Sequence, residues 1–385
     1  MKKLIAVLAV LGISGSVWAG RTVGFGVDAF TASVPAGESG NKVFSPLGFE
    51  FDSVLMANAF EPITKAHFAE TLGVLTGLEG TYVPMLARLR DGAATNRISY
   101  VSARAFLVPG FRNVSPAYAQ ELQREFQAEI GLSFPKEGIE SWFRAMMEGD
   151  MEEFEIPLET AKSERNSFYE LASIRLSWEE PFPTENRRKR AFFPVPADQK
   201  NRVLTDMMCD IRVMELYKAK NFTLGRIPMA DGAWFYAAIP DSDADLKTVR
   251  EQISGKNIDD LLAVMGSITE PGVYKGPAVV AIPVMDLTSS IDLTAAMGQC
   301  KFPVKGYLKL NGELPGKDFR QVVRFRLDEQ GMDAEPLRTK PEDKKVHLDK
   351  NGHAVHSFIL NHPFVFFVYH EPTKSMLVMG QYTGR

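Results

Sequence analysis

Hydrophobic and polar positions follow different patterns in the two halves of the chain. In the first half, apolar residues recur at intervals of three and four, the spacing of a helix with one buried face. Such stretches begin at Ser45-Pro46 and Ser115-Pro116, where a capping serine precedes a proline suited to the first helical turn, and another spans 138–154. From about 169 to 300 the apolar runs are short and separated by Pro, Gly and Asp. Helices followed by strands predict an α+β fold.

Two further stretches complete the expected elements. Residues 97–108 read as a strand, and 364–382 contain two strongly β-prone runs joined by 370–374, which predicts a terminal hairpin. Between them, 331–357 carries ten charged residues, two prolines and no apolar period. We expect an exposed loop there, and loops of this length inside a compact domain are usually functional or disordered.

The N-terminus has the features of a secretory signal. Lys2 and Lys3 precede an apolar run over 4–13, and small residues lead to Ala19, after which cleavage is expected. The short basic start is typical of bacteria. We therefore predict a signal peptide at 1–19 and a secreted chain, extracellular or periplasmic, whose single domain covers 20–385. No later stretch reaches 18 apolar residues, so we expect no membrane span.

Composition narrows the function classes. The chain is 45% hydrophobic and 24% charged, as in ordinary globular proteins, and its formal charge is −4. We saw no clustered positive face and predict no nucleic-acid binding. The two cysteines, Cys209 and Cys300, could pair outside the cytosol, although two buried free thiols are the simpler interpretation.

The sequence carries no catalytic motif. It lacks a GxSxG elbow, an HExxH pair and a phosphate loop. His353 and His356 have metal-ligand character, but no third ligand follows at a known spacing. We therefore expect no enzyme activity, no metal and no cofactor.

Several segments in order resemble the serpin family of serine-protease inhibitors. The stretch from Asn41 to Phe60 resembles the family's opening helix, and 174–182 resembles a strand and turn with a characteristic Trp178. Residues 139–151 match the helix before that strand, and 360–382 match the C-terminal strand pair. The chain is identified as a member on these motifs. The resemblance implies three β-sheets, eight or nine helices and an exposed reactive-centre loop within 331–357.

The family's mechanism gives that loop its expected role. A protease attacks it as a substrate, and the cleaved loop inserts as a new central strand in the largest sheet, distorting the tethered enzyme. The resemblance places Trp178 at the breach, where the loop first enters the sheet. It assigns the hinge to Glu329, Gly331, Met332 and Ala334, and the candidate scissile region to Lys344, Lys345 and Lys350.

The hinge departs from the family pattern of small residues. Met332, Glu335, Pro336 and Arg338 stand where inhibitory members carry mostly Thr, Ala and Ser. Proline cannot donate a ladder hydrogen bond in a central strand, and a buried arginine without a partner is costly. Both changes oppose fast insertion.

A buried polar cluster beneath the main sheet also differs. Ser45 is retained, whereas Gly48, Glu170 and Gln321 occupy positions that are usually Ser, Asn and His. We expect the Gln321 amide to donate a hydrogen bond to Glu170.

Two functions remain open at this stage. The first is a serine-type endopeptidase inhibitor acting as a suicide substrate, with a serine protease, trypsin-like, or a cysteine protease as partner. The second is a non-inhibitory serpin with a binding, carrier or structural role, which the hinge favours. In either case we expect a monomer.

Overall fold

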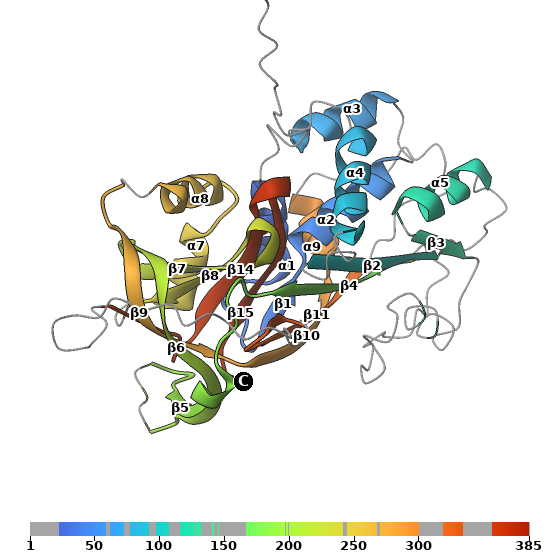
Figure 1. The fold of residues 1–385 in the computed structure, drawn as a ribbon. Helices are drawn as coiled ribbons and strands as arrows, with labels where there is room; N and C mark the ends of the chain where they lie inside the picture. The colour runs from blue at the N-terminus through green and yellow to red at the C-terminus, as the bar shows by residue number, and fades with distance from the viewer. Residues whose placement is uncertain are drawn as a thin grey trace, which may run out of the picture.

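The computed structural model describes residues 23–58, 62–72, 78–91, 98–107, 116–126, 128–131, 141, 145, 167–196, 198, 200–241, 245–267, 270–299, 319–333 and 356–384. Two β-sheets and the helices around them form the molecule (Figure 1).

The larger sheet has nine strands and includes the predicted terminal hairpin. Its order is β1 (Lys42–Phe44), β15 (Ser375–Tyr382), β14 (Phe364–His370), β8 (Ala233–Pro240), β7 (Phe222–Pro228), β6 (Val203–Lys218), β9 (Val273–Pro283) and β13 (His356–Ile359), with β5 (Arg188–Phe192) paired to β6. Every residue of β14 and β15 is buried. Both strands are mostly apolar because both faces of this hairpin are covered.

The second sheet contains the strands that the loop would have to separate. Its order is β10 (Met285–Asp292), β11 (Phe319–Asp328), β12 (Gly331–Met332), β4 (Ser167–Ser177), β2 (Ile98–Leu107) and β3 (Ala128–Gly131). At one end β4 and β11 also pair directly and in parallel, from Phe319 opposite Phe168 to Val323 opposite Ala172.

The helices lie against both sheets. They are α1 (Gly24–Ser33), α2 (Pro46–Ala57), α3 (Pro62–Thr71), α4 (Leu78–Asp91), α5 (Pro116–Phe126), α7 (Leu246–Gln252), α8 (Ile258–Gly266) and α9 (Thr294–Gln299), with short 3-10 turns η3 (Thr184–Asn186), η4 (Ala230–Gly232) and η5 (Glu371–Thr373). As predicted, α2 starts with Ser45 as its N-cap and Pro46 in its first turn. All of α2 is buried, because it contacts β4 and β15 on one side and α3, α4 and α5 on the other.

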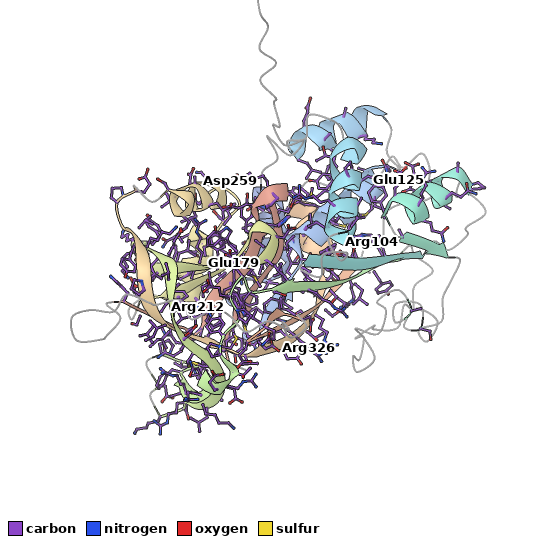
Figure 2. The ribbon with its side chains drawn as sticks, viewed as in Figure 1. Arg104, Glu125, Glu179, Arg212, Asp259 and Arg326 are labelled. Atoms are coloured by element: carbon purple, nitrogen blue, oxygen red, sulfur yellow. The ribbon has the colours of Figure 1, made fainter. Side chains whose placement is uncertain are left out.

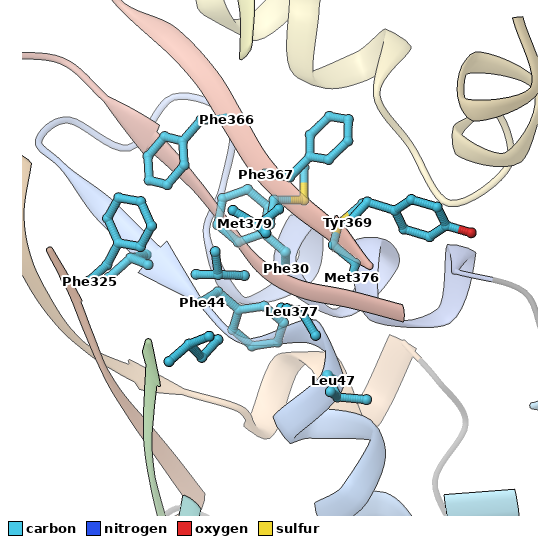
Figure 3. Close-up of a cluster of buried hydrophobic side chains, with 14 of the residues drawn as sticks. Phe30, Phe44, Leu47, Phe325, Phe366, Phe367, Tyr369, Met376, Leu377 and Met379 are labelled. Atoms are coloured by element: carbon cyan, nitrogen blue, oxygen red, sulfur yellow. The ribbon is translucent and has the colours of Figure 1, made fainter. Parts of the chain in front are cut away.

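The core lies where the two sheets approach each other. Figure 3 shows Phe44 from β1, Phe325 from β11 and Phe366 from β14 in one cluster, together with side chains of α1, α2 and β15. The ring centroids of Phe325 and Phe366 are 4.9 Å apart, so these two side chains connect the two sheets. No helix in the described part of the chain is long and apolar enough to cross a membrane.

Three expectations differ in detail. Three sheets were expected, and the described residues form two hydrogen-bonded sheets, with β6 and β9 paired in the larger one. The helix after Ser115 ends at Phe126, and 128–131 pairs with β2 as a strand instead. Residues 331–332 and 356–357, at the two ends of the predicted loop, belong to strands. The helix expected at 138–154 lies almost entirely outside the described residues.

Candidate functional site

The described part of the candidate site is the seam between β4 and β11, together with the two ends of the loop. Residues 334–355 lie outside the described residues, and with them the hinge position Ala334 and the candidate scissile residues Lys344, Lys345 and Lys350. Asp333 stands at one end of this stretch, beside β12 in the second sheet, and His356 begins β13 in the larger sheet.

We call the end of the seam at β12 the upper end, and the end where β4 and β11 pair directly the lower end. The hinge lies at the upper end. Met332 is buried and lies opposite Leu327 of β11 and Leu176 of β4, antiparallel to both. Gly331 precedes it with a φ of 136°, and a Cβ there would lie 2.3 Å from the carbonyl oxygen of Leu176. Only glycine fits this backbone and this close approach. Gly331 and Met332 therefore form a short strand between β4 and β11.

Trp178 holds the turn that leads into the hinge. Its side chain is buried, and its indole Nε1–H donates to the carbonyl oxygen of Asp328 at 2.8 Å. Its backbone N–H donates to the carbonyl oxygen of Gln330 at 3.0 Å. Its ring packs edge-on against Phe182 and Phe235. Trp178 thus connects the end of β4 to the turn between β11 and β12.

An ion pair supports the same turn. Glu329 is only 2% exposed, and Arg187 Nε donates to its Oε1 at 2.6 Å while the guanidinium also contacts its Oε2. Burial favours the neutral acid, but the hydrogen bonds from Arg187 outweigh it, so the pKa of Glu329 is lowered. Glu329 stays ionised and ties the hinge to the segment before β5.

The four cluster residues meet at the lower end of the seam. Gln321 Nε2 donates to Glu170 Oε2 at 2.7 Å and to the carbonyl oxygen of Ser45 at 2.9 Å, and its Oε1 accepts from the Ser45 backbone N–H at 2.8 Å. The Ser45 hydroxyl accepts from the Gly48 N–H and donates to the carbonyl oxygen of Leu377 in β15. The cluster therefore joins β4, β11, β15 and the start of α2.

Gly48 and Glu170 are complementary in volume. A Cβ on Gly48 would lie 2.2 Å from Glu170 Oε1 and 2.7 Å from Oε2. Such distances are not tolerated by real Cβ atoms, so the carboxylate occupies the space that a side chain at 48 would need. The two departures from the family pattern thus compensate each other.

Arg104 of β2 completes the cluster and was not anticipated from the sequence. It lies under the helices in Figure 2, its Nε donates to Asp52 Oδ1 at 2.7 Å, and its Nη2 donates to Glu170 Oε1 at 3.1 Å. Its Nη1 donates to the Ser102 hydroxyl and to the carbonyl oxygen of Phe126. The signal was present: Arg104 interrupts the apolar strand 97–108, and Asp52 interrupts an apolar helix. A buried charge requires a partner of opposite sign.

Three charged side chains in this network are fully buried, those of Asp52, Arg104 and Glu170. Burial and the negative charge of Glu170 raise the pKa of Asp52, although Arg104 acts in the opposite direction. Burial alone would lower the pKa of Arg104, but the two carboxylates outweigh it and raise that pKa. One guanidinium thus faces two carboxyl groups.

A strand inserted into the seam would replace the direct pairing of β4 with β11. Below β12, β4 and β11 are hydrogen-bonded to each other, whereas at β12 they are held apart by one strand. Longer insertion would continue β12 downward, breaking the direct pairing and the bond between Gln321 and Glu170. Within the described ranges, no group of three or more His, Cys, Asp or Glu is placed to hold a metal ion, and Cys209 is a free, half-buried thiol. Cys300 lies outside these ranges.

Comparisons with known proteins agree with this geometry. The family model for Serpin (serine protease inhibitor) matches residues 21–384. A search of curated proteins finds no match.

Solved structures share the fold at low sequence identity. Native protease nexin-1 with heparin is 19% identical, with 94% of this chain and 98% of that chain covered and a TM-score of 0.72. Human thyroxine-binding globulin with its ligand is 16% identical, with coverages of 96% and 98% and a TM-score of 0.72. Uncleaved ovalbumin is 14% identical, with coverages of 96% and 100% and a TM-score of 0.75. The family model spans nearly the whole chain, and the chain belongs to the serpin family.

Proposed function

We propose that the protein inhibits serine proteases by presenting residues 334–355 as bait and inserting the cleaved strand between β4 and β11. The observation that carries this proposal is β12, which already lies antiparallel between these two parallel strands. An extension of β12 would have the direction that insertion requires. The chain itself contributes no catalytic group in this mechanism.

The reaction uses the protease's own chemistry. The protease serine forms an ester with the carbonyl carbon at the scissile bond, and the peptide bond breaks to release a new amino terminus. Insertion of the freed strand then moves the tethered enzyme before water hydrolyses the ester. Lys344, Lys345 and Lys350 make a trypsin-like protease the expected target. The signal peptide predicted at 1–19 supports an encounter outside the cytoplasm.

A non-inhibitory role is the second candidate, and the hinge favours it. Asp333 has a φ of 44° and leaves the seam directly after Met332, and its carboxylate lies 4.0 Å from Arg326. Pro336 and Arg338 follow. A strand that cannot pass these residues would leave the protein a substrate, and thyroxine-binding globulin provides a fold relative that carries a small molecule.

A gel with a panel of proteases separates the two candidates. An inhibitor forms a covalent complex that resists SDS, with trypsin-like enzymes first, whereas a substrate yields only two fragments. A covalent complex with an elastase and none with trypsin would contradict the assignment of the target.

The melting temperature of the protein nicked once in the loop gives an independent answer. A rise on the order of tens of degrees reports full insertion, because a central strand is added and apolar surface is buried. A change of a few degrees supports the non-inhibitory role. Replacing Met332, Glu335, Pro336 and Arg338 with Thr and Ala should then restore the rise if the hinge alone prevents insertion.

A further inference from the structure

Strand β5 gathers positive charge on a protein whose net charge is negative. Residues 186–206 contain six basic and two acidic residues, although the whole chain has a formal charge of −4. Arg188, Lys189 and Arg190 are consecutive and all exposed, as is Arg202 at the start of β6. The absence of a basic cluster inferred from the sequence is therefore wrong for this strand.

These charges are weakly compensated. Among the described residues, the guanidinium of Arg188 donates to the backbone carbonyl oxygens of Glu185 and Arg187 and to no side chain. Lys189 lies opposite the exposed Asp206, and Arg190 lies opposite Thr205. The second acid, Asp198, accepts hydrogen bonds from the Asn201 side chain and from two backbone N–H groups.

Apolar side chains are exposed on the neighbouring strand. Val203 is 42% exposed and Leu204 is 66% exposed, at the start of β6 and directly opposite the end of β5. Protein interfaces combine an apolar centre with arginine. This mixture favours a protein partner over a linear polyanion.

The strand is tied to both flanks of the loop. Before β5, Arg187 binds Glu329 in the hinge turn. After β5, the Phe193 N–H donates to the carbonyl oxygen of Asn361, shortly after β13, at 2.8 Å. β5 lies at the outer edge of the molecule (Figure 1) and pairs, among the described strands, only with β6. The residues next to β5 are therefore hydrogen-bonded to the chain on both sides of 334–355.

From these four observations we propose that Arg188, Lys189, Arg190, Arg202, Val203 and Leu204 form a second contact surface for the protein that attacks the loop, selecting proteases with an acidic surface. We name these residues the β5 surface. The proposal rests on the proposed function in one respect, that a protease is the partner. Charge complementarity at this surface increases the association rate, and exposed charges act most strongly at low salt.

The test uses two trypsins with the same primary specificity and opposite net charge. The rate constant for the first cut in 334–355 is measured for anionic and for cationic trypsin, at low and at high salt. This rate is defined whether the cut leads to a trapped complex or to simple cleavage. A missing complex therefore counts against the proposed function and leaves the measurement of the β5 surface intact.

The variant is R188S/K189S/R190S, and its matched control is K220S/K247S/K256S, which removes three exposed lysines from the β6–β7 turn and the region of α7. We expect the first variant to react with anionic trypsin at least about 10-fold more slowly at low salt, with little change for cationic trypsin. The difference should shrink at high salt. The control should stay within about 2-fold for both enzymes, since electrostatic steering requires charges near the contact.

Other results overturn the proposal. An equal loss with both trypsins, an equal loss in the control, or no loss would show that β5 does not contact the protease. Lysines and arginines also protect exposed strand edges, and a variant that only aggregates would show that this is their role. Weaker retention on dextran sulfate with unchanged rates would assign the surface to a polyanion instead. If neither trypsin cuts the loop, low-salt binding of catalytically inactive anionic trypsin gives the same comparison.

Leu204→Ser tests the apolar part of the surface. It should slow the reaction with anionic trypsin a few-fold at both salt concentrations, because burial of apolar surface is not screened by ions. An effect that disappears at high salt would show that Leu204 makes no contact with the protease.

Discussion

Strands β4 and β11 meet in two ways along one seam. At the lower end they pair directly, and Gln321 reaches across to Glu170 within a fully buried network. At the upper end β12 separates them, and the contacts are backbone hydrogen bonds, the Trp178 indole and the ion pair of Glu329 with the partly exposed Arg187.

The contrast shows where the sheet can open. At the upper end β12 takes the place of direct pairing between β4 and β11. The ion pair of Glu329 with Arg187 is partly exposed to water there, so it is weak. The lower end depends on charges with no access to water, so separating them leaves each without a partner. We expect opening to begin above and to be limited by the lower network.

The largest effect is expected from Arg104→Met. It removes the only positive charge that contacts Asp52 and Glu170 among the described residues, leaving both carboxyl groups buried. Breaking a buried ion pair in this way costs about 3–5 kcal/mol. The free energy of unfolding, from urea titration, should fall by that amount. Arg124→Met on the exposed side of α5 is the control and should change it by less than about 0.5 kcal/mol. Equal effects would refute the distinction between buried and exposed arginines.

Gly48→Ala should have the next largest effect. The new Cβ would meet the Glu170 carboxylate at 2.2 Å, and overpacking of this kind costs about 1–3 kcal/mol. Gly266→Ala, which has open space around its Cβ, is the control. Thermal or urea unfolding of both variants provides the measurement.

A double-mutant cycle sharpens this result. Gly48→Ser and Glu170→Asn together restore the residue types usual in the family, and the pair should be less destabilising than the sum of the single changes by at least about 1 kcal/mol, since contacting residues are coupled. Strict additivity would show that the two positions do not share one space.

Arg187→Ala probes the upper end. Glu329 loses its partner while remaining buried, but Arg187 is itself 44% exposed, so the loss should be only about 1 kcal/mol. Hydrogen exchange at the amides of Gly331 and Met332 should accelerate, with little change at Gln321. The neighbouring Arg188→Ala, which loses contacts to carbonyl oxygens only, is the control. Faster exchange at both ends of the seam would mean that they open as one unit.

The smallest effect is a dependence of the hinge on pH. Burial raises the pKa of Asp333 to about 6, although Arg326 acts against it. The unfolded value is about 3.9. The native state therefore takes up the proton first, and the seated hinge is most stable below about pH 4 and loses that stability as the pH rises through 6. Because the Asp333 side chain is partly exposed, the change in the stability of the seated hinge is limited to about 1 kcal/mol.

Hydrogen exchange at Met332, corrected for the intrinsic pH dependence, measures this change. Protection should be greater at pH 5 than at pH 7.5 in the wild type, and Asp333→Asn should remove the difference. Asp260→Asn, on exposed α8, should leave it unchanged. A hinge that is better protected at pH 7.5 would show that the ion pair with Arg326 dominates instead.

Local sequence patterns were sufficient to predict the helices and strands whose own residues mark them. Ser45-Pro46 marked the start of α2, and the apolar runs at 364–382 marked the hairpin β14–β15. The hydrogen bond from Gln321 to Glu170 followed from reading two unusual residues together. The family resemblance placed these residues, because positions 151 apart carry no local information about contact.

The rest depended on contacts that no single segment specifies. Met332 stands in a mostly polar stretch of the sequence, which predicts an exposed loop. It is nevertheless buried, because β4 and β11 leave space for one strand between them. Arg104 is a charged residue within an apolar strand, and its partners Asp52 and Glu170 come from other elements of the fold. Arg188, Lys189 and Arg190 became a surface only when β5 was placed at an edge of the molecule.

The position of β15 has a consequence for how the chain is made. This strand lies between β1 and β14 deep in the larger sheet, and its Leu377 carbonyl oxygen accepts from Ser45, a residue synthesised more than 300 positions earlier. The core can therefore be completed only after residue 382 has been synthesised. Every shorter growing chain lacks the strand that pairs with both β1 and β14, so the apolar surface that β15 covers stays exposed until then.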